Sequence, residues 1–191
     1  MSHETDAIGR VAGVHRRIET AFAQLDSALI AAEPRIAERA LSVSPWSPLD
    51  VGEHVTLANR FLLMLAEKCA RKSAAKLARG ETADSGGAEL EQLDRIATRE
   101  FRWDAPEHTL PTGAIGLDAV RTTLSEQREE ALALLDSVSP AAAGLHTIRM
   151  TILNPDARLD LNGFLAFIAL HTERHAAQVR RITVALSGTA T

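Results

Sequence analysis

A chain of 191 residues is long enough for one domain with a sizeable core and short for two. Its net charge is −4, and its charged residues are scattered without a basic stripe, which argues against a nucleic-acid partner. Hydrophobic residues make up 46% and aromatic residues 4%, with no Tyr, and the abundance of Ala and Leu favours helices over strands. No apolar run reaches the length of a membrane span, so we expect no membrane partner. The N-terminus lacks a signal-peptide pattern and the single Cys cannot form an internal disulfide, so we expect a cytoplasmic protein.

The first expected helix covers about residues 4 to 32. An apolar stripe at helical spacing marks its inner face, and Pro34 prevents the helix from continuing past Glu33. The stripe consists of Val11, His15, Ile18, Phe22, Leu25 and Leu29. We interpret His15 as a histidine at the edge of the core, and keep a fourth metal ligand as the alternative.

The second expected helix covers residues 48 to 79. Ser47 is suited to cap it, Pro48 fits the first helical position, and Gly80 is suited to end it. Its inward stripe is His54, Leu57, Ala58, Phe61, Leu62, Leu65 and Cys69. Cys69 lies about 22 Å along the helix from His54, too far to share a metal, and we interpret it as a small buried hydrophobe.

A long connection, from Gly80 to Gly113, follows the second helix. It contains a flexible turn and a candidate short helix over residues 89 to 101. Connections of this length are unusual in compact domains, and here one allows the second and third helices of a bundle to run parallel. We therefore expect an all-α fold: one four-helix-bundle domain over residues 1–191, with a crossover between helices two and three.

The third expected helix covers residues 117 to 138 and is followed by Pro140. Gln127 and Arg128 interrupt its apolar stripe; most such residues are solvated, and the alternative places one of them at the wall of an active cavity. After this helix, residues 146 to 153 are the only strand-like run, and they could form an edge strand or extended chain.

The last expected helix covers residues 160 to 187, with Asp160 as a candidate cap after the turn at 154–156. Its inner stripe is apolar except for His171 and His175, which are four residues apart and therefore neighbours on one helix face. His54 interrupts the second helix in the same way. Burying three unpaired imidazoles together would be costly, and coordination of one metal ion supplies a common explanation.

Three histidines without a fourth ligand favour an open site of the kind found in catalytic zinc centres. Imidazole ligands suit zinc, nickel, copper, iron or cobalt. The residues His171 to His175 differ from the zinc-protease pattern, in which an acid directly follows the first histidine; Glu173 comes two positions later and should face away from the metal. Proteolysis is therefore disfavoured. The sequence contains no phosphate-binding loop and no dinucleotide-binding motif, so we expect no nucleotide cofactor.

Two segments carry a resemblance to a known family. The sequence Trp-Ser-Pro-Leu-Asp-Val-Gly-Glu-His over residues 46–54 and the helix over residues 161–178 resemble the DinB-like (DinB/YfiT) metal-binding superfamily, as do the Pro-Thr-Gly turn at 111–113 and the helix after it. The resemblance implies a four-helix bundle with a three-histidine metal site, and hence His54, His171 and His175 as the metal ligands. One departure is Asn154, at a position where close relatives often carry a histidine.

The resemblance also implies a function. Related members are transferases or isomerases that use a low-molecular-weight thiol, so we expect a divalent-metal-binding protein, with zinc or nickel as the ion, that transfers a thiol to a small electrophile. The alternatives are a non-catalytic bundle that binds a metal or small ligand, a metal-dependent hydrolase and, least favoured, a structural bundle with no metal. No catalytic residue is assigned, the expected partner is a small-molecule substrate, and a homodimer is plausible for a bundle of this size.

Overall fold

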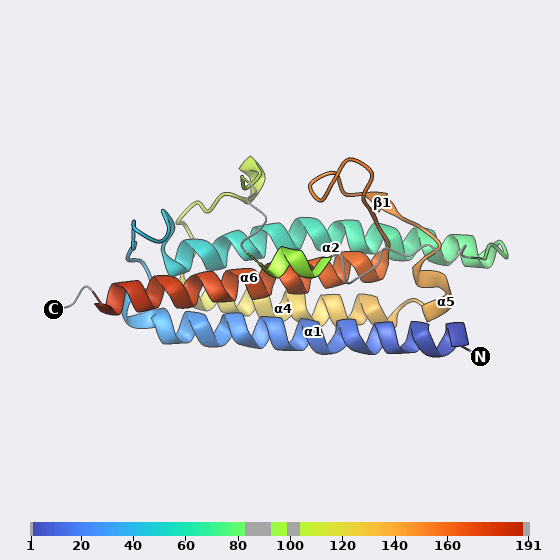
Figure 1. The fold of residues 1–191 in the computed structure, drawn as a ribbon, viewed down its shortest axis with the longest axis horizontal. Coiled ribbons are helices and arrows are strands. Elements are labelled where there is room, and N and C mark those ends of the chain that lie inside the picture. The colour runs from blue at the N-terminus through green and yellow to red at the C-terminus, as the bar shows by residue number, and fades with distance from the viewer. Residues whose placement is uncertain (1, 83–92, 99–103, 189–191) are drawn as a thin grey trace.

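The computed structural model describes residues 2–82, 93–98 and 104–188. It is an all-α bundle, as the sequence predicts, with four long helices and one two-stranded antiparallel ribbon among the described residues (Figure 1). The elements in chain order are α1 (Ser2–Ala32), η1 (Glu33–Arg35), α2 (Pro48–Ala78), η2 (Asp94–Ala97), η3 (Glu107–Thr109), α4 (Leu117–Asp136), α5 (Pro140–Ala143), β1 (Ile148–Arg149), β2 (Arg158–Leu159) and α6 (Leu161–Gly188).

The four long helices share one hydrophobic core, in which α1 and α2 each pack against both α4 and α6. Gly52 of α2 lies against Val120 of α4, and Gln127 of α4 donates a hydrogen bond to the carbonyl of Thr56. From the first contact to the second, the residue number rises in both helices, so α2 and α4 run parallel, as Figure 1 also shows. The predicted crossover between the second and third long helices is therefore present.

The middle of the crossover lies beside α6. Arg17 of α1 forms an ion pair of 2.6 Å with Asp94, and Arg174 of α6 donates to the carbonyl of Thr98 at 2.8 Å. Of the short helix expected over residues 89 to 101, the structure describes residues 93–98, where η2 forms; the rest of that expected helix lies outside the described residues.

The start of α2 follows from its sequence. The hydroxyl of Ser47 accepts from the backbone N–H of Asp50, whose carboxylate accepts from the N–H of Ser47, and Pro48 occupies the first helical position. This reciprocal capping satisfies backbone donors that the first turn of a helix leaves without partners. At the other end, Gly80 adopts a φ of 77°, which a residue without a Cβ reaches at little cost.

The chain between α4 and α6 differs in detail from the expected one. α4 ends at Asp136 rather than 138, and Pro140 begins the short helix α5, consistent with the preference of proline for the first helical position. The strand-like run contributes only the two residues of β1, which pair with β2. Asp160 caps α6, accepting from the N–H of Gly163 at 2.7 Å. No described helix has a sufficiently long and apolar stretch to cross a bilayer.

Candidate metal centre

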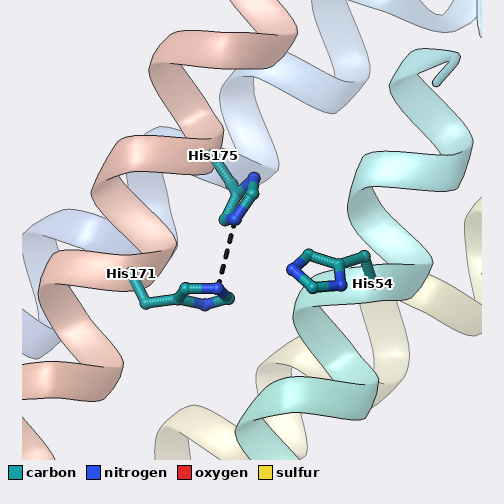
Figure 2. Close-up of side chains that lie close together, drawn as sticks. All are labelled: His54, His171 and His175. Carbon is teal, nitrogen blue, oxygen red and sulfur yellow. Dashed lines mark hydrogen bonds between the residues drawn. The ribbon is translucent and has the colours of Figure 1, made fainter. Parts of the chain in front are cut away.

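His54 of α2 and His171 and His175 of α6 converge in the bundle interior (Figure 2). Their side chains are almost fully buried, with exposed fractions of 4%, 8% and 7%. One ring nitrogen from each lies within 4.8 Å of those of the other two, and Nε2 of His171 is 3.1 Å from Nε2 of His175. The structure thus brings together the three residues that the sequence indicates as ligands.

His54 is oriented by the crossover. Its Nδ1 lies 2.8 Å from the carbonyl oxygen of Thr109. Because a carbonyl oxygen can only accept, Nδ1 carries the proton and the Nε2 lone pair is left for another partner. The ring of Trp46 packs beside the imidazole, with 4.8 Å between ring centroids. A backbone group and an indole therefore hold His54 as a neutral donor.

His175 has a side-chain partner on its own helix. Its Nδ1 lies 2.9 Å from Oε1 of Gln178, three residues further on, and the Gln178 amide nitrogen donates to Oγ of Ser44 at 3.1 Å. The Ser44 hydroxyl also accepts from the backbone N–H of Trp46. With Gln178 oriented in this way, the His175 proton is on Nδ1, and Nε2 again has its lone pair available.

His171 differs from the other two because its Nδ1 is buried without a hydrogen-bond partner. Its ring stacks against that of Phe167, with 6.3 Å between centroids, and its Nε2 faces Nε2 of His175. A buried imidazole nitrogen that finds no protein partner is costly and calls for an explanation, such as an ordered water. Nε2 of His171, and not Nδ1, is the atom that faces a second histidine.

All three imidazoles are held in the neutral form. Burial lowers the pKa of His54, and the hydrogen bond to Thr109 opposes this effect. Burial, followed by the nearby histidines and Arg174, lowers the pKa of His171 well below its usual value. Burial is also the main cause that lowers the pKa of His175, to about 3. Neutral imidazole is the form that binds a metal.

The donor set fits a transition metal. Zinc–nitrogen distances of about 2.0–2.1 Å at tetrahedral angles place two ligating nitrogens roughly 3.3 Å apart, close to the 3.1 Å between His171 and His175. Neutral nitrogen ligands suit zinc, nickel, copper, iron or cobalt better than magnesium or calcium, which prefer oxygen. Three protein ligands would leave a coordination position for another molecule.

The three histidines lie on the wall of a cavity of about 550 Å³. This volume is in the range of small-molecule sites. α2, α6, the η3 segment and the chain after β1 all contribute to its lining. The lining residues are Pro45, Trp46, His54, Ala58, Phe61, Leu62, Asp104, Ala105, Pro106, His108, Thr109, Leu110, Met150, Ile152, Phe167, His171, Arg174, His175 and Gln178. A molecule in this cavity can therefore reach the histidines directly.

Glu53, next to His54, anchors the crossover against α2. Its side chain is only 2% exposed, and its carboxylate accepts from the backbone N–H of Thr112 at 3.0 Å, the Thr112 hydroxyl at 2.5 Å and the N–H of Gly113 at 2.9 Å. Hydrogen bonds to a charged acceptor are about twice as strong as neutral ones. Consecutive residues of α2 thus hold both the turn at 111–113 and the carbonyl of Thr109.

Other polar residues noted in the sequence lie away from the three histidines. His15 is half-buried on α1, 3.7 Å from Glu19, and belongs to no group of candidate ligands among the described residues. Gln127 is buried but points to the carbonyl of Thr56, and the half-exposed Arg128 lies near Glu129. Neither Gln127 nor Arg128 lines the cavity, so the alternative of a substrate contact from this pair is not supported.

The positions of Glu173, Cys69 and Asn154 also bear on the site. Glu173 lies 3.8 Å from Arg17 on α1, so it points away from the histidines and the zinc-protease arrangement is absent. Cys69 is fully buried, and burial and Asp160 raise its pKa to about 12. Asn154 accepts from the N–H of Asp156 in the turn between β1 and β2 and does not line the cavity.

Sequence reasoning missed several contributors to the site. The carbonyl of Thr109 and the clamp formed by Glu53 have no sequence signature, because both depend on where the crossover folds back onto α2. Gln178 could have been found from spacing, since it lies three residues after His175 and therefore on the same helix face. His108, which the sequence places in the connection before the third long helix, lies outside the histidine cluster, although it lines the cavity.

In a comparison with known families, the family model of the DinB superfamily matches residues 10–179. The matched segment contains His54, His171 and His175, and it confirms the resemblance seen in the sequence. Neither the curated proteins nor the solved structures include a significant match.

Proposed function

The chain belongs to the DinB superfamily, and we propose that it binds one divalent transition metal through His54, His171 and His175 and transfers a thiol from solution to a small electrophile. The observation that carries the proposal is the convergence of three neutral imidazoles on the wall of a small-molecule cavity, with Nε2 of His171 and Nε2 of His175 only 3.1 Å apart. Zinc or nickel is the ion we favour, in keeping with the nitrogen donors.

A metal held in this way would act as a Lewis acid and would keep a coordinated thiol deprotonated. The protein side chains supply the rest. Thr109 and Gln178 hold His54 and His175 with their Nε2 atoms directed inward. The bundle leaves the three rings almost fully buried, and the cavity gives a second reactant a place beside them.

The residues around the cavity favour thiol transfer over hydrolysis. Metal-assisted hydrolysis usually employs a carboxylate or histidine as general base for water, whereas a bound thiolate is already a nucleophile. Among the described cavity residues the only carboxylate is Asp104, and the only histidine besides the three candidate ligands is His108. Both residues are exposed rather than held beside the three histidines. A nucleophile that needs no further base suits this lining better.

The thiol must come from outside the protein. Cys69 is the only cysteine, it is fully buried and its thiol lies against the carbonyl of Leu159. Neither Cys69 nor Leu159 lines the cavity. A low-molecular-weight thiol that enters the cavity therefore has no competitor from the chain itself.

The first test is metal analysis of the purified protein, followed by titration with Zn²⁺ and Ni²⁺. One metal per chain is expected, and His171→Ala should reduce its affinity by at least about 100-fold, whereas His15→Ala, which removes a half-buried histidine of α1, should leave the affinity unchanged. No uptake of either metal would overturn the proposal.

The second test is turnover by the metal-loaded protein. A panel of low-molecular-weight thiols and small electrophiles should give a product with a new carbon–sulfur bond, absent with His171→Ala. Loaded protein that is inert across the panel but binds thiols would favour a non-catalytic binding protein. Loaded protein that hydrolyses esters or amides without thiol would favour a hydrolase.

A further inference from the structure

We propose that the cavity selects thiols with an apolar alkyl or aryl body over polar ones; this rests on the proposed function and specifies the class of its thiol substrate. The sulfur would lie at the histidines and the body against the cavity walls. Two features of the cavity support this selectivity: many of its lining side chains are apolar, and most of its polar groups are already hydrogen-bonded within the protein.

The walls are aromatic and aliphatic on several sides. α2 contributes Phe61 and Leu62, α6 contributes Phe167, and the chain after β1 contributes Met150 and Ile152. These residues come from three separate parts of the chain, so a body that enters the cavity meets apolar side chains from all three. Thioether and aromatic side chains adapt well to hydrocarbon surfaces.

Most polar groups that line the cavity already have partners within the protein. The carbonyl of Thr109 accepts from His54, and the amide of Gln178 bonds His175 and Ser44. Arg174 donates to the carbonyl of Thr98. A thiol with many amide or hydroxyl groups would lose its hydrogen bonds to water on entry and would find few replacements, which is costly for each unmatched group.

The mouth of the cavity also offers apolar surface. The side chains of Phe61 and Leu110 are 39% and 44% exposed, and the exposed ring of His108 contacts Phe61 with 5.0 Å between centroids. A ligand body that extends towards this mouth would cover these side chains. Asp104 is exposed, so a polar end group could reach water there.

This arrangement predicts how affinity depends on chain length. Each methylene removed from water contributes about 0.8 kcal/mol, which is roughly a fourfold gain in affinity. Affinity for the loaded protein should therefore rise about fourfold per added CH₂ from ethanethiol to hexanethiol and level off when the cavity is filled. A polar thiol of comparable length, such as glutathione, should bind more weakly than hexanethiol.

The experiment is a titration of the Ni²⁺-loaded protein with ethanethiol, butanethiol, hexanethiol and glutathione, followed through the thiolate-to-nickel absorption band. Ile152→Gln, which puts an amide on the wall, should flatten the dependence on chain length and lower hexanethiol affinity about tenfold or more. The matched control is Arg149→Gln, an exposed position of the same ribbon that does not line the cavity. Near-wild-type circular dichroism and nickel content must accompany each variant.

The outcomes separate this inference from the function on which it rests. A rising series in the wild-type protein supports it, and this measurement does not depend on any variant folding. Equal affinities across the alkyl series, or tighter binding of glutathione, would overturn the selectivity while leaving thiol binding intact. Nickel-loaded protein that binds no thiol would overturn both proposals.

Discussion

The Nδ1–H of His54 donates to the backbone carbonyl of Thr109 across 2.8 Å, and so ties a histidine of α2 to the crossover that walls the cavity. The corresponding partner of His175 is a side chain, Gln178. Groups that orient metal-binding histidines commonly contribute 10- to 100-fold to metal affinity. A substitution cannot remove the backbone carbonyl of Thr109, but it can remove the side chain of Gln178. A Gln178 variant therefore tests whether the hydrogen-bond partners of the histidines contribute to metal affinity.

Gln178→Ala should weaken Zn²⁺ binding by about 10-fold, since His175 would lose the acceptor that fixes its proton on Nδ1. Competition with a chromophoric chelator measures the change. Gln127→Ala is the matched control, because Gln127 is a buried amide on α4 that bonds the carbonyl of Thr56 and does not line the cavity. It should lower stability and leave zinc affinity near the wild-type value. Equal effects of the two substitutions on affinity would contradict an orienting role for Gln178.

Glu53→Ala should lower the free energy of unfolding by about 2 to 4 kcal/mol, because Thr112 and Gly113 would lose a charged acceptor. Urea denaturation of the metal-free protein measures the change. Zinc affinity should also fall, since Thr109, whose carbonyl orients His54, lies only three residues before Thr112. Glu67→Ala, at an exposed position of α2, should change neither quantity by more than about 0.5 kcal/mol. A Glu53 variant as stable as the wild-type protein would show that the turn is held by other contacts.

The helices were predictable because local signals mark them. Ser47 and Pro48 predict the start of α2 at the residue where it begins, and the spacing of His171 and His175 places both on one face of α6. His54 joins these two histidines in the prediction because it too lies on an apolar helix face, and burying three unpaired imidazoles would be costly. Each of these predictions needs only short-range spacing along one helix or the burial of one helix face.

The groups that orient the histidines and hold the crossover against α2 were not predictable in this way. By its position, Glu53 is an acidic residue near the start of α2, where a negative charge suits the helix dipole, yet in the structure it is buried and holds residues of the crossover. Thr109 acts through its backbone, which no side-chain pattern reveals. Contacts between residues 50 to 60 positions apart depend on the path of a long connection, and periodicity carries no information about that path.

The metal-free protein should lose stability as the pH falls below about 6.5. The pKa of each of His54, His171 and His175 is lowered by burial, so the unfolded chain binds protons before the folded one does. The free energy of unfolding then decreases from pH 6.5 towards 3, by about 2 kcal/mol at pH 5 for each histidine that stays neutral. Urea denaturation at pH 7.5 and pH 5 measures this loss.

The control for this pH dependence is His171→Leu, which removes one of the titrating groups and should show a shallower decrease. The raised pKa of Asp160 acts in the opposite sense and is common to both proteins. Identical slopes in the two proteins would mean that His171 does not resist protonation in the folded state.

Cys69 should be inert in the folded protein. Its side chain is fully buried and its pKa is raised to about 12, whereas thiolate is the form that reacts with alkylating agents. Iodoacetamide at pH 8 should leave the native protein unmodified by mass spectrometry and add one group per chain in urea. Modification of the native protein at the rate of a free thiol would contradict the burial of Cys69 and would reopen a role for it in thiol chemistry.

Two glycines within helices should respond oppositely to the same substitution. A Cβ at Gly52 would lie 2.9 Å from Cγ1 of Val120 and 3.3 Å from Leu29, whereas a Cβ at Gly13 would meet nothing within 4 Å. Replacement of glycine by alanine in a helix gains up to about 1 kcal/mol of helix propensity, and overpacking a core costs about 1 to 3 kcal/mol. Gly13→Ala should therefore raise the free energy of unfolding and Gly52→Ala should lower it. Because Gly52 sets how closely α2 approaches α4, its substitution should also weaken metal binding through His54, two residues away, and Gly13→Ala should not. A Gly52 variant with wild-type stability and affinity would show that the side chain of Val120 gives way without moving α2.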